Sequence, residues 1–204
     1  MQKLIMTLIV CIITFGQIEA QQSFGIKGGL NISNLAVDKD HIKDTNAKNG
    51  WTVGLINRSN AGLLTVQTEL LWSRKGAKYM VGATDVDANL DYLELPLTLN
   101  IRLFNSPLLV YGGGYAAYLL NAKYEYNDSQ GNVFATYDER DAFHKWDFGL
   151  AAGASLQLQN LLLDARITRG LSNVESESIT TPAQTFLAND TKNFNIQFTA
   201  GFLF

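Results

Sequence analysis

The feature that most constrains this chain is a strict alternation of apolar with polar or small residues. In its last stretch every second side chain is apolar: Phe194, Ile196, Phe198, Ala200, Phe202 and Phe204. The residues between them, such as Asn195 and Gln197, are polar or small. Alternation with a period of two over this length predicts a β-strand with one apolar face.

The same alternation recurs along the chain, and no stretch after residue 20 shows a helical period. The predicted strands lie near residues 24–32, 51–55, 64–73, 93–103, 108–124, 146–158, 161–168 and 194–204. Short turns are predicted at 57–60, 105–107 and 159–160, and long polar loops at 33–50, 74–90, 125–144 and 172–192. Short and long connections in alternation describe an up-and-down meander. We therefore predict an all-β fold, an eight-stranded antiparallel up-and-down β-barrel with no exposed edge.

The period alone does not say which face of the barrel meets water. A soluble, lipocalin-like barrel would turn its apolar face inward, and a membrane barrel would turn it outward. Three observations favour the membrane barrel: the polar face is mostly small, its charges nearly balance, and aromatic residues such as Trp51, Trp72 and Trp146 lie near strand ends. We therefore predict a transmembrane barrel with short periplasmic turns and long extracellular loops.

Charged residues on the polar face form a candidate network inside this barrel. They are Lys27, Glu69, Glu94, Arg102, Asp147, Asp164 and Arg166. Buried charges need partners, and eight strands leave room for little more than packed side chains. The favoured interpretation is therefore structural, with a gated or leaky pore and a catalytic pair left as alternatives.

The N-terminus predicts a secretory signal peptide over residues 1–20, followed by a barrel domain over 21–204. One lysine precedes an apolar run of about 12 residues, too short to span a membrane as a helix, and Ala20 supplies a small residue at the cleavage site. Cys11, the only cysteine, lies in this run. The net charge of -3 is spread over the chain, which argues against a nucleic-acid partner.

Few other motifs suggest chemistry. Gly112-Gly113-Gly114 lacks the lysine and the following helix of a phosphate loop. His41 and His144 have acidic neighbours but no recognised metal spacing, so we predict neither a catalytic residue, nor a metal, nor a cofactor. Four cations near the long-loop end are candidates for contact with lipopolysaccharide phosphates, or are ordinary rim residues: Arg74, Lys75, Lys78 and Arg169.

Several segments resemble the PorT-like, porin-family outer-membrane β-barrel proteins of Gram-negative bacteria. The resemblance covers the whole mature chain and is carried by residues 25–31 (GIKGGLN), 90–97 (LDYLELPL), 112–115 (GGGY), 147–150 (DFGL) and the terminal Phe204. It implies an eight-stranded barrel in the outer membrane. It also implies that Phe204 contributes to a signal read by the barrel-assembly machinery.

These features predict a small, non-enzymatic outer-membrane barrel with a structural, surface-interaction or secretion and envelope-accessory role. Its expected partners are outer-membrane lipid and lipopolysaccharide, the assembly machinery, and secretion or surface proteins reached through the loops. Two alternatives stay open: a narrow porin-like channel and a soluble periplasmic lipocalin-like binding barrel.

Overall fold

The structure, a computed structural model, describes residues 21–36, 45–81, 84–104, 106–127, 133–138, 144–172 and 192–204. The predicted signal peptide over residues 1–20 lies outside these ranges, as does His41 with its acidic neighbours. In the part of the chain described, no helix is long and apolar enough to cross a membrane.

The described residues form nine antiparallel strands in one sheet. They are β1 (Gln21–Ala36), β2 (Thr45–Ala61), β3 (Leu64–Val81), β4 (Thr84–Arg102), β5 (Leu108–Asn127), β6 (Val133–Asp138), β7 (Trp146–Leu158), β8 (Leu161–Gly170) and β9 (Lys192–Leu203). Eight of them close a barrel in the order β1-β2-β3-β4-β5-β7-β8-β9, and β9 pairs back with β1. The predicted eight-stranded antiparallel barrel is confirmed.

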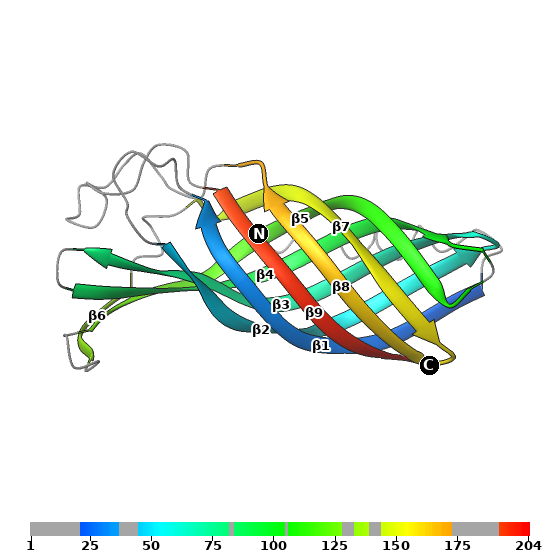
Figure 1. Ribbon diagram of the computed structural model, residues 1–204, viewed down its shortest axis with the longest axis horizontal. Helices are drawn as coiled ribbons and strands as arrows, with labels where there is room; N and C mark the ends of the chain where they lie inside the picture. Colours follow the sequence, from blue (N-terminus) through cyan, green and yellow to red (C-terminus); the bar gives the residue numbers. More distant parts are fainter. Residues whose placement is uncertain are drawn as a thin grey trace, which may run out of the picture.

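The ninth strand, β6, extends the ladder of β5 beyond the barrel wall. β7 pairs with residues 108–118 of β5, and β6 pairs with residues 123–127. Figure 1 shows the steeply tilted strands, with the C-terminus at the short-turn end and the β3–β4 and β5–β6 hairpins projecting at the other end. We call the end with the projecting hairpins the long-loop end.

Two of the predicted turns are correct, and several predicted loops are wrong. The turns between β4 and β5 and between β7 and β8 lie near 105–107 and at 159–160, as predicted. Residues 57–60, however, are strand, and the turn lies at Gly62, whose φ of 66° suits glycine. Most of the predicted loop 74–90 is also strand, because β3 and β4 pair as far as Val81 and Thr84. In each case polar residues of a barrel strand resemble a loop.

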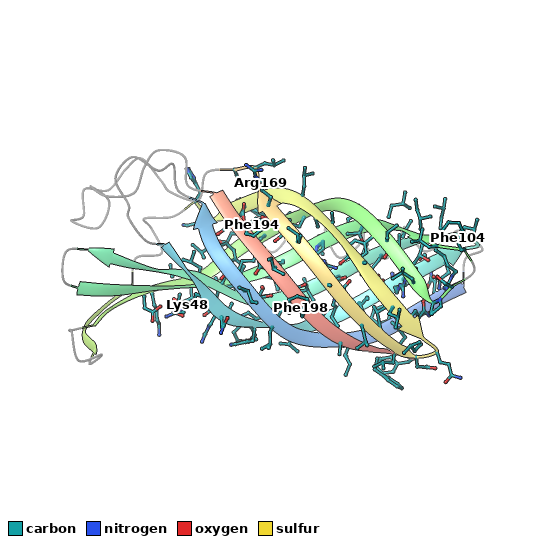
Figure 2. All side chains as sticks on the ribbon, in the orientation of Figure 1. Lys48, Phe104, Arg169, Phe194 and Phe198 are labelled. Atoms are coloured by element: carbon teal, nitrogen blue, oxygen red, sulfur yellow. The ribbon has the colours of Figure 1, made fainter. Side chains whose placement is uncertain are left out.

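The apolar face of the sheet points outward and the polar face points into the lumen. On β1, Phe24 and Leu30 are 54% and 64% exposed, whereas Lys27 and Asn31 are 2% and 0% exposed. The same inversion holds along β9, where Phe198 projects from the wall (Figure 2). This arrangement suits a barrel surrounded by lipid, and it contradicts the soluble lipocalin-like alternative.

Aromatic side chains form clusters on the outer surface near both ends of the barrel. At the long-loop end the rings of Trp51 and Trp72 lie 5.5 Å apart, and Trp146 stacks on Phe148 at 6.0 Å. Phe202 and Phe204 lie 6.0 Å apart at the short-turn end. Such clusters at two levels correspond to the aromatic girdles that mark membrane interfaces.

The short-turn end is held together by backbone bonds and contains an apolar cluster. The backbone N–H of Phe204 donates to the carbonyl of Phe24 at 2.7 Å, which ties the chain end to β1. Inside the barrel at this end, Ile56, Leu162 and Leu203 form a buried apolar cluster. Buried polar side chains such as Arg58 and Asn100 lie at the same end.

The orientation of the wall can be tested with a charge on its outer face. We expect Leu97→Arg, near mid-height on β4, to lower the free energy of unfolding in lipid vesicles by about 2–4 kcal/mol, because arginine meets hydrocarbon there. The control is Leu64→Arg beside the Gly62 turn, where we expect about 0–1 kcal/mol. Urea unfolding measures both, and equal effects would contradict the assigned facing.

Candidate functional site: a charged brace across the barrel lumen

Four charged side chains and one tyrosine meet in the lumen, and we call this group the lumen brace: Lys27, Glu69, Tyr111, Asp164 and Arg166. The guanidinium of Arg166 donates to both oxygens of Glu69, at 2.6 and 2.9 Å. Lys27 Nζ lies 3.2 Å from Glu69 and 3.4 Å from Asp164. Tyr111 donates to Asp164 at 2.7 Å and accepts from Arg166 Nε at 3.1 Å. The charged side chains are no more than 1% exposed.

The brace joins strands that face each other across the barrel. Glu69 is on β3 and Arg166 on β8, and three strands separate these two along either side of the ring. Lys27 on β1 and Tyr111 on β5 face each other in the same way. Because contacts from both opposed pairs meet at Asp164 and Glu69, the brace crosses the full width of the lumen.

Two inward tyrosines of β5 fit into the lumen because glycines lie opposite them on β7. A Cβ atom at Gly153 would lie 2.5 Å from the hydroxyl of Tyr111, and one at Gly149 would lie 2.5 Å from the ring of Tyr115. The tyrosines therefore pack directly on the backbone of β7. This packing is the reason for an alternation of large and small residues between the two strands.

A second group of polar side chains lies closer to the long-loop end, and we call it the outer cluster: Lys75, Tyr92, Glu94, Tyr115, Asp147, Ser172 and Asn193. Asp147 accepts hydrogen bonds from Tyr115 at 3.1 Å, Asn193 at 2.8 Å and Ser172 at 2.9 Å. Lys75 forms a buried ion pair with Glu94. Its ammonium also lies 5.0 Å from the ring centre of Tyr115, a cation–π distance.

The structure places six of the seven predicted network residues in these two groups. Lys27, Glu69, Asp164 and Arg166 belong to the brace, whereas Glu94 and Asp147 belong to the outer cluster. Arg102 belongs to neither group, because its side chain is half-buried at the short-turn end and donates to the carbonyl of Ser106 at 3.3 Å. Its position on the last residue of β4 explains the difference.

One predicted rim residue lies inside the barrel instead. Lys75 has the same parity on β3 as Glu69, so its side chain points inward and is 1% exposed. It cannot contact lipopolysaccharide from there. Its odd or even position along the strand was the signal that could have identified Lys75 as an inward residue. The same signal applies to Tyr111 on β5 and to Arg58 on β2.

The remaining rim cations do not form a single site. Arg74 on β3 is held by Asp91, with Nε 2.7 Å from the carboxylate, and packs over the ring of Trp51. Arg169 is exposed on β8, the strand opposite β3 in the ring. Lys78 is on β3, but its side chain is outside the described part of the structure. The cations are thus distributed around the wall.

The chemistry of both groups is that of ion pairs and hydrogen bonds. Ser172 donates its hydroxyl proton to Asp147 and accepts from the backbone N–H of Phe148 at 2.9 Å. That arrangement holds the loop end of β8 against β7. Among the described residues, no group of three or more His, Cys, Asp or Glu could hold a metal ion.

Comparisons with known proteins agree with this architecture. A family model described as "Outer membrane protein beta-barrel domain" matches residues 16–176. Among solved structures, Neisserial surface protein A is similar, with a TM-score of 0.53 and 12% identity over 90% of this chain and 99% of that one. The Ail protein of Yersinia pestis has 19% identity over 92% and 100%, with a TM-score of 0.48. At these identities the likeness shows the fold alone. A comparison with curated sequences finds no significant match.

The energetic role of the brace can be measured with single and double substitutions. We expect Glu69→Leu to lower the free energy of unfolding by about 3–5 kcal/mol, because it leaves Arg166 buried without its main partner. Adding Arg166→Met should recover much of this loss, since Lys27 and Asp164 then remain as a neutral pair. Urea unfolding in vesicles measures both variants.

The matched control removes a more exposed ion pair. Asp91→Asn breaks the pair with Arg74, whose side chain is 40% exposed, and should cost at most about 1 kcal/mol. If Glu69→Leu costs no more than this control, the brace does not stabilise the barrel.

Proposed function

Because the chain belongs to the family of outer membrane protein beta-barrel domains and lies in the outer membrane, we propose that it is a closed, non-enzymatic membrane anchor. In this proposal the barrel holds its long-loop end at the cell surface, in a structural, surface-interaction or secretion and envelope-accessory role. The observation that carries the proposal is the lumen brace, which joins both opposed pairs of strands.

The brace argues against the narrow channel as the function. Ions would have to pass Glu69 and Arg166, which are bonded to each other twice and are fully buried. Ile56, Leu162 and Leu203 add a cluster of buried apolar side chains beside these groups. An eight-stranded barrel has an interior just wide enough for its own side chains, which supports a lumen with no continuous aqueous path.

The long-loop end supplies the features that suit an anchor for surface contacts. β3 and β4 remain paired as far as Val81 and Thr84, and β4 and β5 as far as Asp85 and Asn127. β6 adds a further strand outside the wall. Lys48 and Asp87 form an ion pair of 2.6 Å between β2 and β4 at this end. A paired sheet of this length supports a rigid platform that projects from the membrane.

The proposal also includes a narrower family group, an assembly partner and a lipid contact. The segments at 25–31, 90–97 and 147–150 support membership of the PorT-like group, and Phe204 supports recognition by the barrel-assembly machinery. Contact with lipopolysaccharide is proposed for Arg169, whose exposed side chain is on the outer face of β8, and for Arg74 as a weaker contact because Asp91 neutralises it.

Conductance in a planar bilayer tests the closed-anchor proposal. We expect no ion conductance from the folded wild-type protein. Glu69→Ala should open conductance that prefers anions, because Lys27, Arg58 and Arg166 then face only Asp164 in that part of the lumen. Asp91→Asn on the outer face is the control and should stay closed. Steady conductance from the wild type would overturn the proposal.

The orientation of the anchor can be tested by cysteine labelling on whole cells. Cys11 is the only cysteine and lies in the predicted signal peptide, so single-cysteine variants should have a clean background. We expect a membrane-impermeant maleimide to label His144→Cys at the long-loop end. Leu63→Cys, in the exposed turn between β2 and β3, should react only after the outer membrane is permeabilised. The reverse pattern would place the long-loop end in the periplasm.

A further inference from the structure

Arg58 is a buried arginine whose charge has no acidic partner in its hydrogen bonds. Its side chain points into the lumen from β2 near the short-turn end, and the residue is 0% exposed. Nη1 donates to the neutral amide oxygen of Gln157 at 3.0 Å. Nε and Nη2 have no hydrogen-bond partner in the structure. A buried guanidinium normally uses its planar set of donors on a carboxylate or another anion.

Two carboxylates lie within electrostatic range of Arg58, and both hydrogen-bond to other residues. Glu69 and Asp164 lie within electrostatic range of Arg58. Glu69, however, accepts from Lys27, from Gln67 and twice from Arg166, which fills the approximately four lone-pair sites of a carboxylate. Asp164 accepts hydrogen bonds from Tyr111 and Lys27. Neither carboxylate is hydrogen-bonded to Arg58, whose Nε and Nη2 have no partner.

The buried charges in this part of the lumen do not balance. Three cations, Lys27, Arg58 and Arg166, stand against two carboxylates, Glu69 and Asp164, which leaves an excess of one positive charge. Arg102, at the same end of the barrel, adds repulsion within electrostatic range of Arg58. The opposite excess lies in the outer cluster, where Glu94 and Asp147 face Lys75 alone.

The two excesses are too far apart to compensate each other. Gln157, the partner of Arg58, and Asp147 are both on β7 and are ten positions apart, or about 30 Å along the strand. Asp147 receives three neutral hydrogen bonds, whereas Arg58 has one. The unmet requirement for charge therefore lies at Arg58.

We propose that the short-turn half of the lumen binds one small inorganic anion of the chloride class on Nε and Nη2 of Arg58. Water could accept from the free N–H groups of Nε and Nη2, but it would leave the excess charge uncompensated. Gln67 lies directly across the β2–β3 ladder from Arg58 and is 1% exposed, so the site is enclosed on that side. The enclosure favours a compact monovalent anion over a phosphate ester or a peptide carboxylate.

The test is the stability of the folded full-length mature protein in detergent as a function of chloride. Chloride replaces gluconate, an anion too large for the site, at constant ionic strength, and urea unfolding gives the midpoint. An anion that binds only the folded state should raise the midpoint progressively from 1 to 100 mM chloride. A wild-type midpoint that does not change over this range would overturn the proposal, whether or not any variant folds.

Arg58→Met should remove the dependence on chloride, and Arg169→Gln is the matched control because it deletes an exposed arginine on the outer wall. Loss of the dependence in Arg58→Met alone supports the site. An equal chloride response in Arg58→Met and the wild type would overturn it. Crystals grown with bromide in place of all chloride supply a second readout. We expect an anomalous peak at Arg58, and its absence would count against the site.

Discussion

The barrel depends on the requirement that its inward charges be satisfied by groups inside the lumen. Lipid surrounds the wall, so polar side chains have no exit on that side, and the lumen of eight strands admits little water. Removing one partner of a buried ion pair lowers the free energy of unfolding strongly. The intact pair adds little to that free energy compared with apolar residues of similar volume. The bidentate contact between Arg166 and Glu69, supported by Lys27 and Tyr111, meets this requirement with residues from four strands. The same contact that stabilises the interior therefore also closes it.

The brace also constrains the register of the strands. A slip of one residue in any strand would move its inward set to the lipid face. For β8 this would expose Arg166 and Asp164 to hydrocarbon and bring Ile167 into the polar lumen. Because the brace takes residues from β1, β3, β5 and β8, a slip in any one of these strands removes a partner from the others. Alternation in the sequence determines which side chains point inward. The brace determines which inward residues of different strands lie at the same level along the barrel axis.

Much of the fold could be predicted from the sequence, because a period of two indicates a strand whichever of its faces meets water. The facing could also be predicted, from small residues such as Gly149 and Gly153, which the structure places under two tyrosines. Strand ends could not be predicted well. Polar runs usually indicate loops, but in a barrel with a polar interior they can be wall, and Arg58 and Lys75 were assigned to a turn and a rim for this reason. The contact partners of each charge depend on strand tilt and register, which the linear pattern does not contain.

The two ends of the lumen solve the problem of an unbalanced charge by different means. In the long-loop half, Asp147 is held by hydroxyl and amide donors from β5, β9 and Ser172, two residues after β8, so neutral dipoles stabilise its negative charge. In the short-turn half, Arg58 finds only Gln157, since the carboxylates of the brace are committed elsewhere. Buried hydroxyl and amide groups such as Thr65 and Asn100 lie in this half too, but they carry no negative charge. A small anion then becomes the simplest counter-charge, because it needs no further side chain.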